Sequence, residues 1–354
     1  SPGNPIRFSL GPARWLNTLH GIFFVSLFSL AAYHVSSFDS MKSLRISPVI
    51  VGLILGAIYA NSFGKDLPSE WMPGIGFCKD KILNVAIIFY GVKLTFQDLF
   101  QVGLGGFLAS VFIVISTFIV AFLIGKYCFK LDYELSLLIA AGSSICGSAA
   151  ILATSSILKS KSYKNSVAVA ITFLFGTAGM LLFPLVYRLG WLPINEDIFG
   201  IFLGATLPSV GNVAAAGAAI SEAVAKNAII IKMIRVMMLV PFLLFLGSFV
   251  SKKYAGGDYD TPMGIPRKNK LVIPWFAILF MVMIAMNSWL QPPLGVVDFI
   301  NHADKFCLTM AMTALGLETS ANKMQGVGLK PIYLGFVVSI WLVAAGLLIV
   351  HFTG

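Results

Sequence analysis

The stretch GSSICGSAA, residues 142–150, lies in the middle of an apolar segment that is long enough to cross a membrane. Its residues are small and able to form hydrogen bonds, where a helix facing lipid would carry leucine. Backbone N–H and C=O groups left unpaired in hydrocarbon cost several kcal/mol each, so a helix can stop there only if protein or a water-filled cavity takes over its hydrogen bonds. The stretch therefore favours a helix that breaks inside the protein, and a row of small residues for close helix packing is the alternative.

The composition of the chain is that of an integral membrane protein. Of its 354 residues, 58% are hydrophobic and only 11% are charged, and the mean hydropathy is +0.88, whereas an ordinary soluble domain carries about 25% charged residues. The net charge of +10 comes from basic residues placed between apolar blocks, without the basic stripe and interleaved aromatic residues of a nucleic-acid-binding surface. We therefore expect the lipid bilayer, and no nucleic acid, as a partner.

A bilayer core of roughly 30 Å is crossed by about 20 apolar helical residues, and this criterion predicts an all-α protein with eleven transmembrane helices in a single domain, 1–354. The predicted spans are 14–35, 47–62, 82–97, 107–125, 135–157, 166–187, 198–220, 228–249, 272–290, 304–319 and 332–352. Assigning Lys and Arg to alternate sides places 15 of them on the N-terminal side and 7 on the other. By the positive-inside rule, the N-terminus is then cytoplasmic and, with an odd number of spans, the C-terminus is outside.

Two short stretches indicate an internal repeat. GLILGA at 52–57 and GIFLGA at 200–205 lie in the second and seventh spans, so two five-helix units would have opposite orientations. This is the inverted-repeat plan of many secondary transporters, and it predicts repeats at 47–187 and 198–352 after an extra N-terminal helix at 14–35. A second similarity pairs spans three and ten instead, but only the five-helix repeat accounts for every span after the first.

The fourth helix of each predicted repeat has a polar centre that contains glycine, at 135–157 and 304–319. We expect both helices to be discontinuous and to cross, because half-helix N-termini that meet at one point form an anion site. In the seventh span, Pro208 removes a backbone hydrogen bond and frees a carbonyl group in the turn before it, with a simple kink as the alternative. The candidate substrate-binding residues are Ser143, Ser144, Cys146, Gly147, Ser148, Thr206, Ser209, Asn212 and Gly316.

Other polar residues indicate the coupling ion and an anion pathway. Glu318 and Thr319, together with Asn212, are candidate ligands of a coupling cation or proton, and a position at the lipid headgroups is the alternative for Glu318. Lys232 and Arg235 are three residues apart and share one helix face. Charge inside a membrane indicates function by default, so we expect this pair to attract anions, with snorkelling to the interface as the alternative.

Enzymatic motifs are absent from the sequence. It contains no HExxH, no P-loop, no GxSxG with a placed histidine and no intramembrane aspartate pair. The four cysteines lie far apart, without a CxxC or Cys/His pairing. We expect no enzyme, hence no catalytic residue, and no metal site or resident cofactor. The coupling ion is left open between Na⁺ and H⁺.

Five stretches together resemble the Putative Sulfate Exporter family, bacterial membrane proteins grouped with the bile-acid/sodium symporter superfamily. They are VGLILGAIYAN (51–61), IIFYGVKLTFQDL (87–99), GSSICGSAAILA (142–153), IKMIRVMMLVP (231–241) and ALGLETSANKMQGVGLKP (314–331). The resemblance covers nearly the whole chain. It implies a multi-pass protein of the bacterial inner membrane, with two discontinuous helices crossing in a core domain beside a panel domain, and transport of small anions such as sulfate or sulfite.

One segment departs from that family. Its members tend to carry a histidine, an acidic residue and then VAQVVAAG, where this chain has Pro208, Ser209 and VGNVAAAG. The titratable pair is absent, so roles that depend on it are not carried over to this chain.

The sequence therefore predicts a secondary active transporter of a small inorganic or organic anion, working by alternating access at a site between 135–157 and 304–319. Two alternatives are a sodium-driven importer of organic anions and a non-transporting membrane sensor with a transporter-like fold. A homodimer formed through helices rich in Phe and Gly is also left open.

Overall fold

The computed structural model describes residues 12–38, 47–62, 68–192, 194–255, 275–290, 293–318 and 328–353. Every regular element in these ranges is a helix, which confirms the predicted all-α class. The chain divides into two compact units, one made of residues 1–89 with 298–321 and the other of 90–297 with 322–354. The predicted repeats at 47–187 and 198–352 divide the chain differently and stay a prediction.

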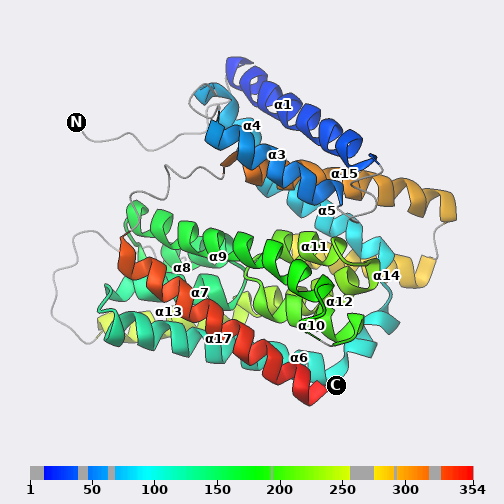
Figure 1. Ribbon diagram of the computed structural model, residues 1–354. Coiled ribbons are helices and arrows are strands. Elements are labelled where there is room, and N and C mark those ends of the chain that lie inside the picture. Colours follow the sequence, from blue (N-terminus) through cyan, green and yellow to red (C-terminus); the bar gives the residue numbers. More distant parts are fainter. Residues whose placement is uncertain are drawn as a thin grey trace. The chain divides into compact units, whose positions relative to one another are not determined.

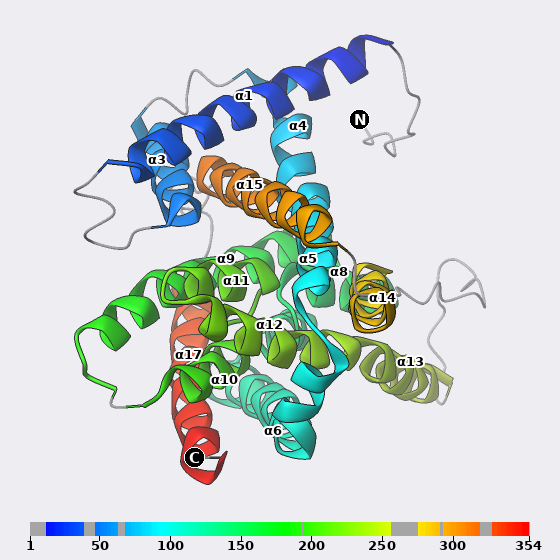
Figure 2. The ribbon, with the colours of Figure 1, turned by 90° about the vertical axis from the view of Figure 1, so that its right-hand side faces the viewer.

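The described residues of the first unit form four α-helices and most of a fifth, which begins in the second unit. They are α1 (Pro12–Ser36), α3 (Pro48–Ser62), α4 (Met72–Phe77), α5 (Leu83–Tyr90) and α15 (Leu294–Glu318). A 3₁₀ turn, Ser69–Trp71, leads into α4, and a π-helical turn, Cys78–Ile82, joins α4 to α5. α1 packs against α3 and α4 (Figure 2), and Val25, Ile75 and Cys78 belong to the apolar core of this unit.

In its described residues, the second unit contains ten α-helices. They are α6 (Phe96–Leu123), α7 (Tyr133–Ser144), α8 (Ser148–Leu158), α9 (Ser162–Arg188), α10 (Glu196–Thr206), α11 (Val210–Ala218), α12 (Glu222–Met237), α13 (Leu239–Ala255), α14 (Trp275–Leu290) and α17 (Leu329–Thr353). A 3₁₀ turn, Gly91–Lys93, precedes α6, and a π-helical turn, Ile124–Cys128, follows it.

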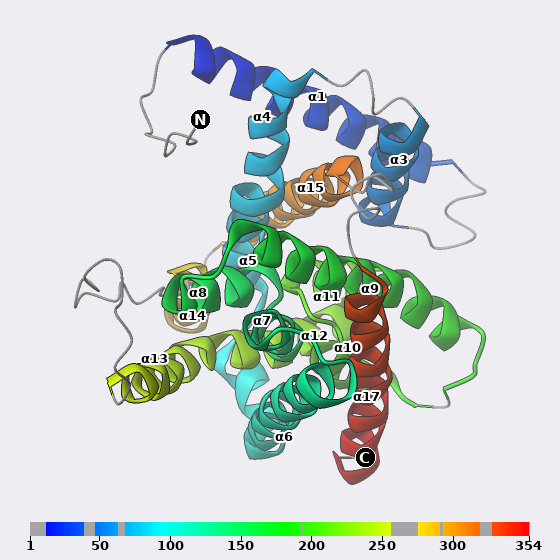
Figure 3. The same ribbon diagram turned by 90° about the vertical axis from the view of Figure 1, so that its left-hand side faces the viewer.

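Short helices form the centre of the second unit. α12 packs against α10 and α11 (Figure 1), and α7 packs against α6 and α9 (Figure 3). Residues 136–144 of α7 and 210–217 of α11 are buried throughout. In contrast, α6, α9 and α17 expose large apolar side chains such as Phe112, Leu182 and Phe336. This distribution suits a protein whose long helices face lipid and whose short helices are surrounded by protein.

The GLILGA and GIFLGA stretches are helix-packing motifs in the two units. In α3, a methyl group at Gly56 would lie 2.5 Å from the carbonyl oxygen of Thr313 on α15. In α10, a methyl group at Gly204 would lie 2.5 Å from the carbonyl oxygen of Ala228 on α12. Each motif therefore places glycine where two helix backbones approach closely.

Within the part of the chain that the structure describes, five helical stretches have the length and apolar composition needed to cross a membrane. They are Leu16–Ser36, Gly103–Cys128, Tyr163–Arg188, Glu222–Ser248 and Leu329–His351. Among the described residues, α3, α8 and α14 are apolar but shorter. The full count of eleven spans and the sidedness of the termini stay predictions.

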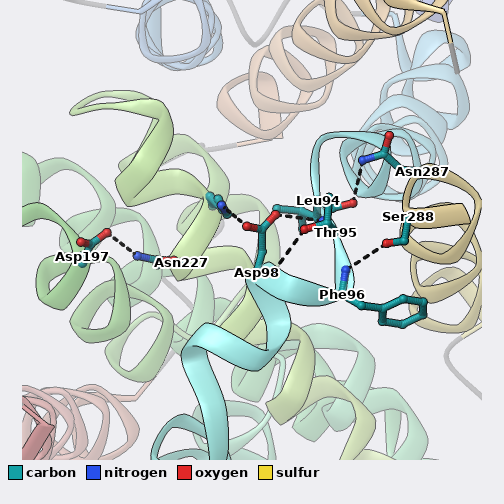
Figure 4. Close-up of polar contacts among 9 residues, drawn as sticks. Leu94, Thr95, Phe96, Asp98, Asp197, Asn227, Asn287 and Ser288 are labelled. Atoms are coloured by element: carbon teal, nitrogen blue, oxygen red, sulfur yellow. Dashed lines mark hydrogen bonds and ion pairs between the residues drawn. The ribbon is translucent and has the colours of Figure 1, made fainter. Parts of the chain in front are cut away.

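The start of α6 connects three helices of the second unit (Figure 4). Thr95 and Asp98 form a reciprocal capping box, and Asp98 Oδ1 accepts a hydrogen bond from Lys226 Nζ of α12 at 2.5 Å. Burial raises the pKa of the Asp98 carboxyl, but the hydrogen bonds from Lys226 and Thr95 outweigh it, so this pKa lies below its ordinary value. Two α14 side chains bond the same segment: Asn287 Nδ2 donates to the Leu94 carbonyl and Ser288 Oγ accepts from the Phe96 N–H, both at 2.9 Å.

Candidate anion site at two broken helices

α7 and α8 are the two halves of one interrupted helix. α7 ends at Ser144, Ile145 leaves the helical conformation with φ −107° and ψ −84°, and Gly147 has φ +76° before α8 begins at Ser148. Glycine adopts that positive φ without the strain that a side chain would cause. The helix therefore stops and restarts within GSSICGSAA, as the sequence predicts.

A second interruption separates α10 from α11. α10 ends at Thr206, and Leu207 is extended with φ −73° and ψ 136°. Pro208 cannot continue the helix because it lacks an N–H group, and Ser209 caps α11 by accepting a hydrogen bond from the Asn212 N–H at 3.2 Å. The freed carbonyl that the sequence predicts here thus belongs to a complete break in the helix.

The two interruptions lie side by side. A methyl group at Gly147 would lie 3.6 Å from the Ser209 Cβ atom and 3.8 Å from the Pro208 carbonyl oxygen, so the N-termini of α8 and α11 are adjacent. Ser148 is exposed and Ser209 is half-buried, which leaves these N-termini accessible to a solute. Because a helix N-terminus carries a partial positive charge and free N–H groups, the pair of N-termini favours an anion.

Arg235 of α12 holds the opposite ends of the breaks, the C-termini of α7 and α10. Its Nη2 atom donates to the carbonyl oxygens of Ser144 at 2.7 Å and Ser143 at 3.2 Å. Its Nη1 atom donates to those of Ala205 at 2.6 Å and Gly204 at 2.8 Å. Carbonyl groups at a helix C-terminus have no partner within the helix. One guanidinium group therefore supplies partners to both interrupted helices.

Lys232, one turn before Arg235 on the same helix, bonds the residues inside the two breaks. Its Nζ atom donates to the carbonyl oxygen of Ile145 at 2.5 Å and to that of Leu207 at 3.0 Å. An ammonium group has three N–H donors, and in the described part of the chain the third has no hydrogen-bond acceptor. Lys232 and Arg235 are both 0% exposed, so neither side chain snorkels to an interface.

The two adjacent breaks, residues 143–148 and 204–209, together with Lys232 and Arg235 form a region that we call the crossing. It carries an excess of positive charge. Every acceptor of Lys232 and Arg235 among the described residues is a backbone carbonyl, and none is a carboxylate. The C-termini of α7 and α10 contribute about half a negative charge each, while the N-termini of α8 and α11 contribute about half a positive charge each. These partial charges cancel to a first approximation, so about two positive charges remain when Lys232 and Arg235 are both protonated. Buried charge without a counter-charge is costly, and a bound anion would reduce that cost.

A small cavity lies beside the crossing, lined by residues of α7, α9, α10 and α17 as well as Leu207 and Pro208. Its volume is about 30 Å³, which is enough for a water molecule or two. The hydroxyl groups of Thr172, Thr206 and Ser339 line it, and each donates to a carbonyl of its own helix. Ser143 also lines it, and in the described structure its hydroxyl has no hydrogen-bond partner. The wall of the cavity is therefore mostly apolar, with four hydroxyl-bearing residues in it, and the cavity has room for water.

The structure gathers ten of the predicted site residues at the crossing. They are Ser143, Ser144, Cys146, Gly147, Ser148, Thr206, Ser209, Asn212, Lys232 and Arg235. Ser144 acts through its carbonyl, because its hydroxyl donates to Ala141 at 3.3 Å. Asn212 is buried against α9, where a methyl group at Gly176 would lie 2.3 Å from its Nδ2 atom.

The prediction of a second broken helix is wrong for the described residues of that span, 304–318, because α15 runs through them without interruption. Gly316 serves close packing instead: a methyl group there would lie 2.2 Å from the Leu53 carbonyl oxygen of α3. Glu318 Oε2 accepts a hydrogen bond from Lys79 Nζ at 2.6 Å within the first unit, and Thr319 lies outside the described residues. The break that accompanies GSSICGSAA is at Pro208, and sequence reasoning missed this pairing.

A signal for that pairing is present in the sequence. Lys232 and Arg235 share one helix face and follow Pro208 by about two dozen residues. That spacing is long enough for the chain to form a short helix, turn and bring a second helix back past Pro208. Two side-chain cations near a proline that frees a carbonyl are natural partners for that carbonyl.

Long apolar helices around a centre of buried, interrupted helices define a membrane-embedded helical protein. Comparison with known proteins gives the family. The chain belongs to the family described as Conserved hypothetical protein 698, whose model matches residues 20–335.

Curated relatives that are named membrane proteins cover almost the whole chain. A UPF0324 membrane protein of Bacteroides thetaiotaomicron is 44% identical over 334 residues, which are 94% of this chain and 98% of the relative. A UPF0324 membrane protein of Pseudomonas putida is 38% identical over 331 residues, 94% of this chain and 92% of the relative. One of Haemophilus influenzae is 36% identical over 329 residues, 93% and 95% respectively. No solved structure matches the chain.

Proposed function

We propose that this protein is a secondary active transporter of a small anion, which binds at the crossing of α7/α8 with α10/α11. The observation that carries the proposal is a pair of fully buried cations, Lys232 and Arg235, whose acceptors in the described structure are all backbone carbonyls. In secondary transporters, interrupted helices point half-helix N-termini at anionic substrate groups. The adjacent N-termini of α8 and α11 have that arrangement.

Each part of the crossing has a distinct role in this proposal. The free N–H groups at the starts of α8 and α11, with the Ser148 and Ser209 hydroxyls, bind the anion from the accessible side. Lys232 and Arg235 hold the two breaks together from the buried side and supply the positive field. Small size and high charge density in the substrate fit a site made mostly of N–H donors and serine hydroxyls. Sulfate, sulfite and small sulfonates or carboxylates meet these requirements.

The mechanism is alternating access, in the bacterial inner membrane. The site alternates between the two sides of the membrane as one group of helices moves against another. The direction of transport follows the gradients of the substrate and of any coupling ion. The proposed transporter can therefore export sulfate, as is implied for the family that the sequence resembles.

Flux measurement tests this function. Purified protein in proteoliposomes is given labelled sulfate, sulfite or a small sulfonate or carboxylate under imposed pH, sodium and voltage gradients. The proposal expects at least one of these anions to move faster than in protein-free liposomes. It also expects Ser148→Leu, at an exposed position, to slow that flux while leaving the protein folded. If none of the anions moves under any gradient, the proposal fails.

The same experiment separates the two alternative functions. A sodium-driven importer of organic anions would show flux only with an inward sodium gradient. A membrane sensor would show anion-dependent thermal stabilisation without flux. The position of the buried Lys232 ammonium group bears on the first alternative.

A further inference from the structure

The C-termini of interrupted helices are where transporters of this general plan bind a coupling cation. Unwound backbone carbonyls and half-helix C-terminal ends coordinate the ion there. In this protein the corresponding carbonyl groups belong to the ends of α7 and α10 and to the residues just after them. They are Ser143, Ser144, Ile145, Gly204, Ala205 and Leu207.

Every one of these six carbonyl oxygens accepts a hydrogen bond from α12. Ile145 and Leu207 oxygens lie 2.5 and 3.0 Å from the same Lys232 Nζ atom. The two oxygens come from different interruptions, and both contact the ammonium group of Lys232. Arg235 donates hydrogen bonds to the other four carbonyl oxygens. Its Nη1 atom also donates to the Leu207 carbonyl oxygen at 3.3 Å.

We propose that Lys232 is a built-in replacement for a coupling sodium ion, so that sodium neither binds at the crossing nor drives transport. The ammonium nitrogen occupies the position between the Ile145 and Leu207 oxygens that a bound cation would need. Because it is attached to α12, it does not leave the site during a transport cycle. The conclusion that sodium does not drive transport rests on the proposed transport function. The conclusion that the Lys232 ammonium group fills the cation position does not.

Binding of sodium alone tests this occupancy without any substrate. Thermal unfolding of the detergent-purified protein is followed in NaCl and in choline chloride at equal ionic strength. The wild type is expected to have the same Tm in both salts. Lys232→Ala removes the ammonium group and leaves space between the two carbonyl oxygens, so this variant is expected to be stabilised by NaCl relative to choline chloride.

Lys226→Ala is the matched control, because Lys226 lies on the same helix but pairs with Asp98 rather than with the crossing. It is expected to remain insensitive to sodium, like the wild type. A sodium-specific rise in the Tm of the wild type would overturn the proposal, and this measurement does not depend on whether any variant folds. A folded Lys232→Ala protein without a sodium-specific rise would overturn it as well.

Flux separates the failure of this inference from the failure of the transport proposal. With a transported anion in hand, replacing sodium by choline on both sides is expected to leave the initial rate of the wild type unchanged. Flux that requires sodium would overturn the inference while supporting transport. Absence of flux together with a sodium-insensitive Tm would contradict transport and leave Lys232 in the cation position.

Discussion

Two apolar segments with glycine and polar residues at their centres, 135–157 and 304–319, have opposite structures. The first is interrupted at Ile145 and Gly147, whereas the second lies within a continuous helix that ends at Glu318. What differs is the surroundings of the backbone. Freed carbonyls of the first segment accept hydrogen bonds from Lys232 and Arg235. The glycine of the second segment, Gly316, gives room for α3.

Small polar residues thus permit a break in an apolar helix but do not cause it. A broken helix inside a membrane protein needs donors for its carbonyls and acceptors for its N–H groups. α12 supplies such donors through two cations on one face. Where that supply is missing, the same residue types favour an unbroken helix with close packing.

The largest effect is expected from Arg235→Met, which removes the group that holds both breaks. The carbonyls of Ser143, Ser144, Gly204 and Ala205 would lose their partner, and each buried unsatisfied group costs about 1–3 kcal/mol. We expect a loss of at least about 3 kcal/mol in the free energy of unfolding, measured by denaturant titration in detergent. Lys226→Met is the control on the same helix, with an expected loss of about 1 kcal/mol or less. Equal losses would show that the crossing does not depend on Arg235.

Two alanine substitutions separate the roles of glycine in the two segments. Gly316→Ala brings a methyl group within 2.2 Å of the Leu53 carbonyl oxygen, and such overpacking costs about 1–3 kcal/mol. Gly147→Ala instead forces a side chain into φ +76°, a conformational cost of about 1–2 kcal/mol. Unfolding measurements should show both losses, but only Gly147→Ala should alter anion-dependent stabilisation. Gly105→Ala, where a methyl group meets nothing within 4 Å, should cause no loss.

A smaller effect is expected from breaking the pair between Lys226 of α12 and Asp98. The pKa of Asp98 is lowered in the folded protein, because the hydrogen bonds from Lys226 and Thr95 outweigh the effect of burial. Its contribution to stability is therefore complete above the unfolded pKa of about 3.9 and is lost as the pH falls toward the lower folded value. Asp98→Asn should reduce stability at pH 7 by about 1 kcal/mol or less and flatten the decline below about pH 4. An unchanged decline would show that Lys226 does not stabilise this carboxylate.

Much of this architecture could be predicted from the residues themselves. The break in GSSICGSAA followed from glycine and serine within an apolar span, and the freed carbonyl before Pro208 followed from the missing N–H. The pairing of these two breaks could not be predicted from GLILGA and GIFLGA, because each motif places glycine at a close contact between helices and neither contains a break. Glu318 could not be assigned from its sequence neighbours, because its partner, Lys79, is 239 residues away.

Thermal stabilisation by anions, compared between two matched variants, tests whether the anion binds at the crossing. Ser148→Leu changes an exposed residue at the accessible N-terminus of α8. Glu318→Gln changes the candidate ion ligand in the predicted span 304–319, which pairs with Lys79. General salt effects of sulfate or sulfite on stability act on both variants equally. We predict that the stabilisation is lost in Ser148→Leu and kept in Glu318→Gln. Stabilisation that is kept in Ser148→Leu and lost in Glu318→Gln would contradict the assignment of the anion site to the crossing.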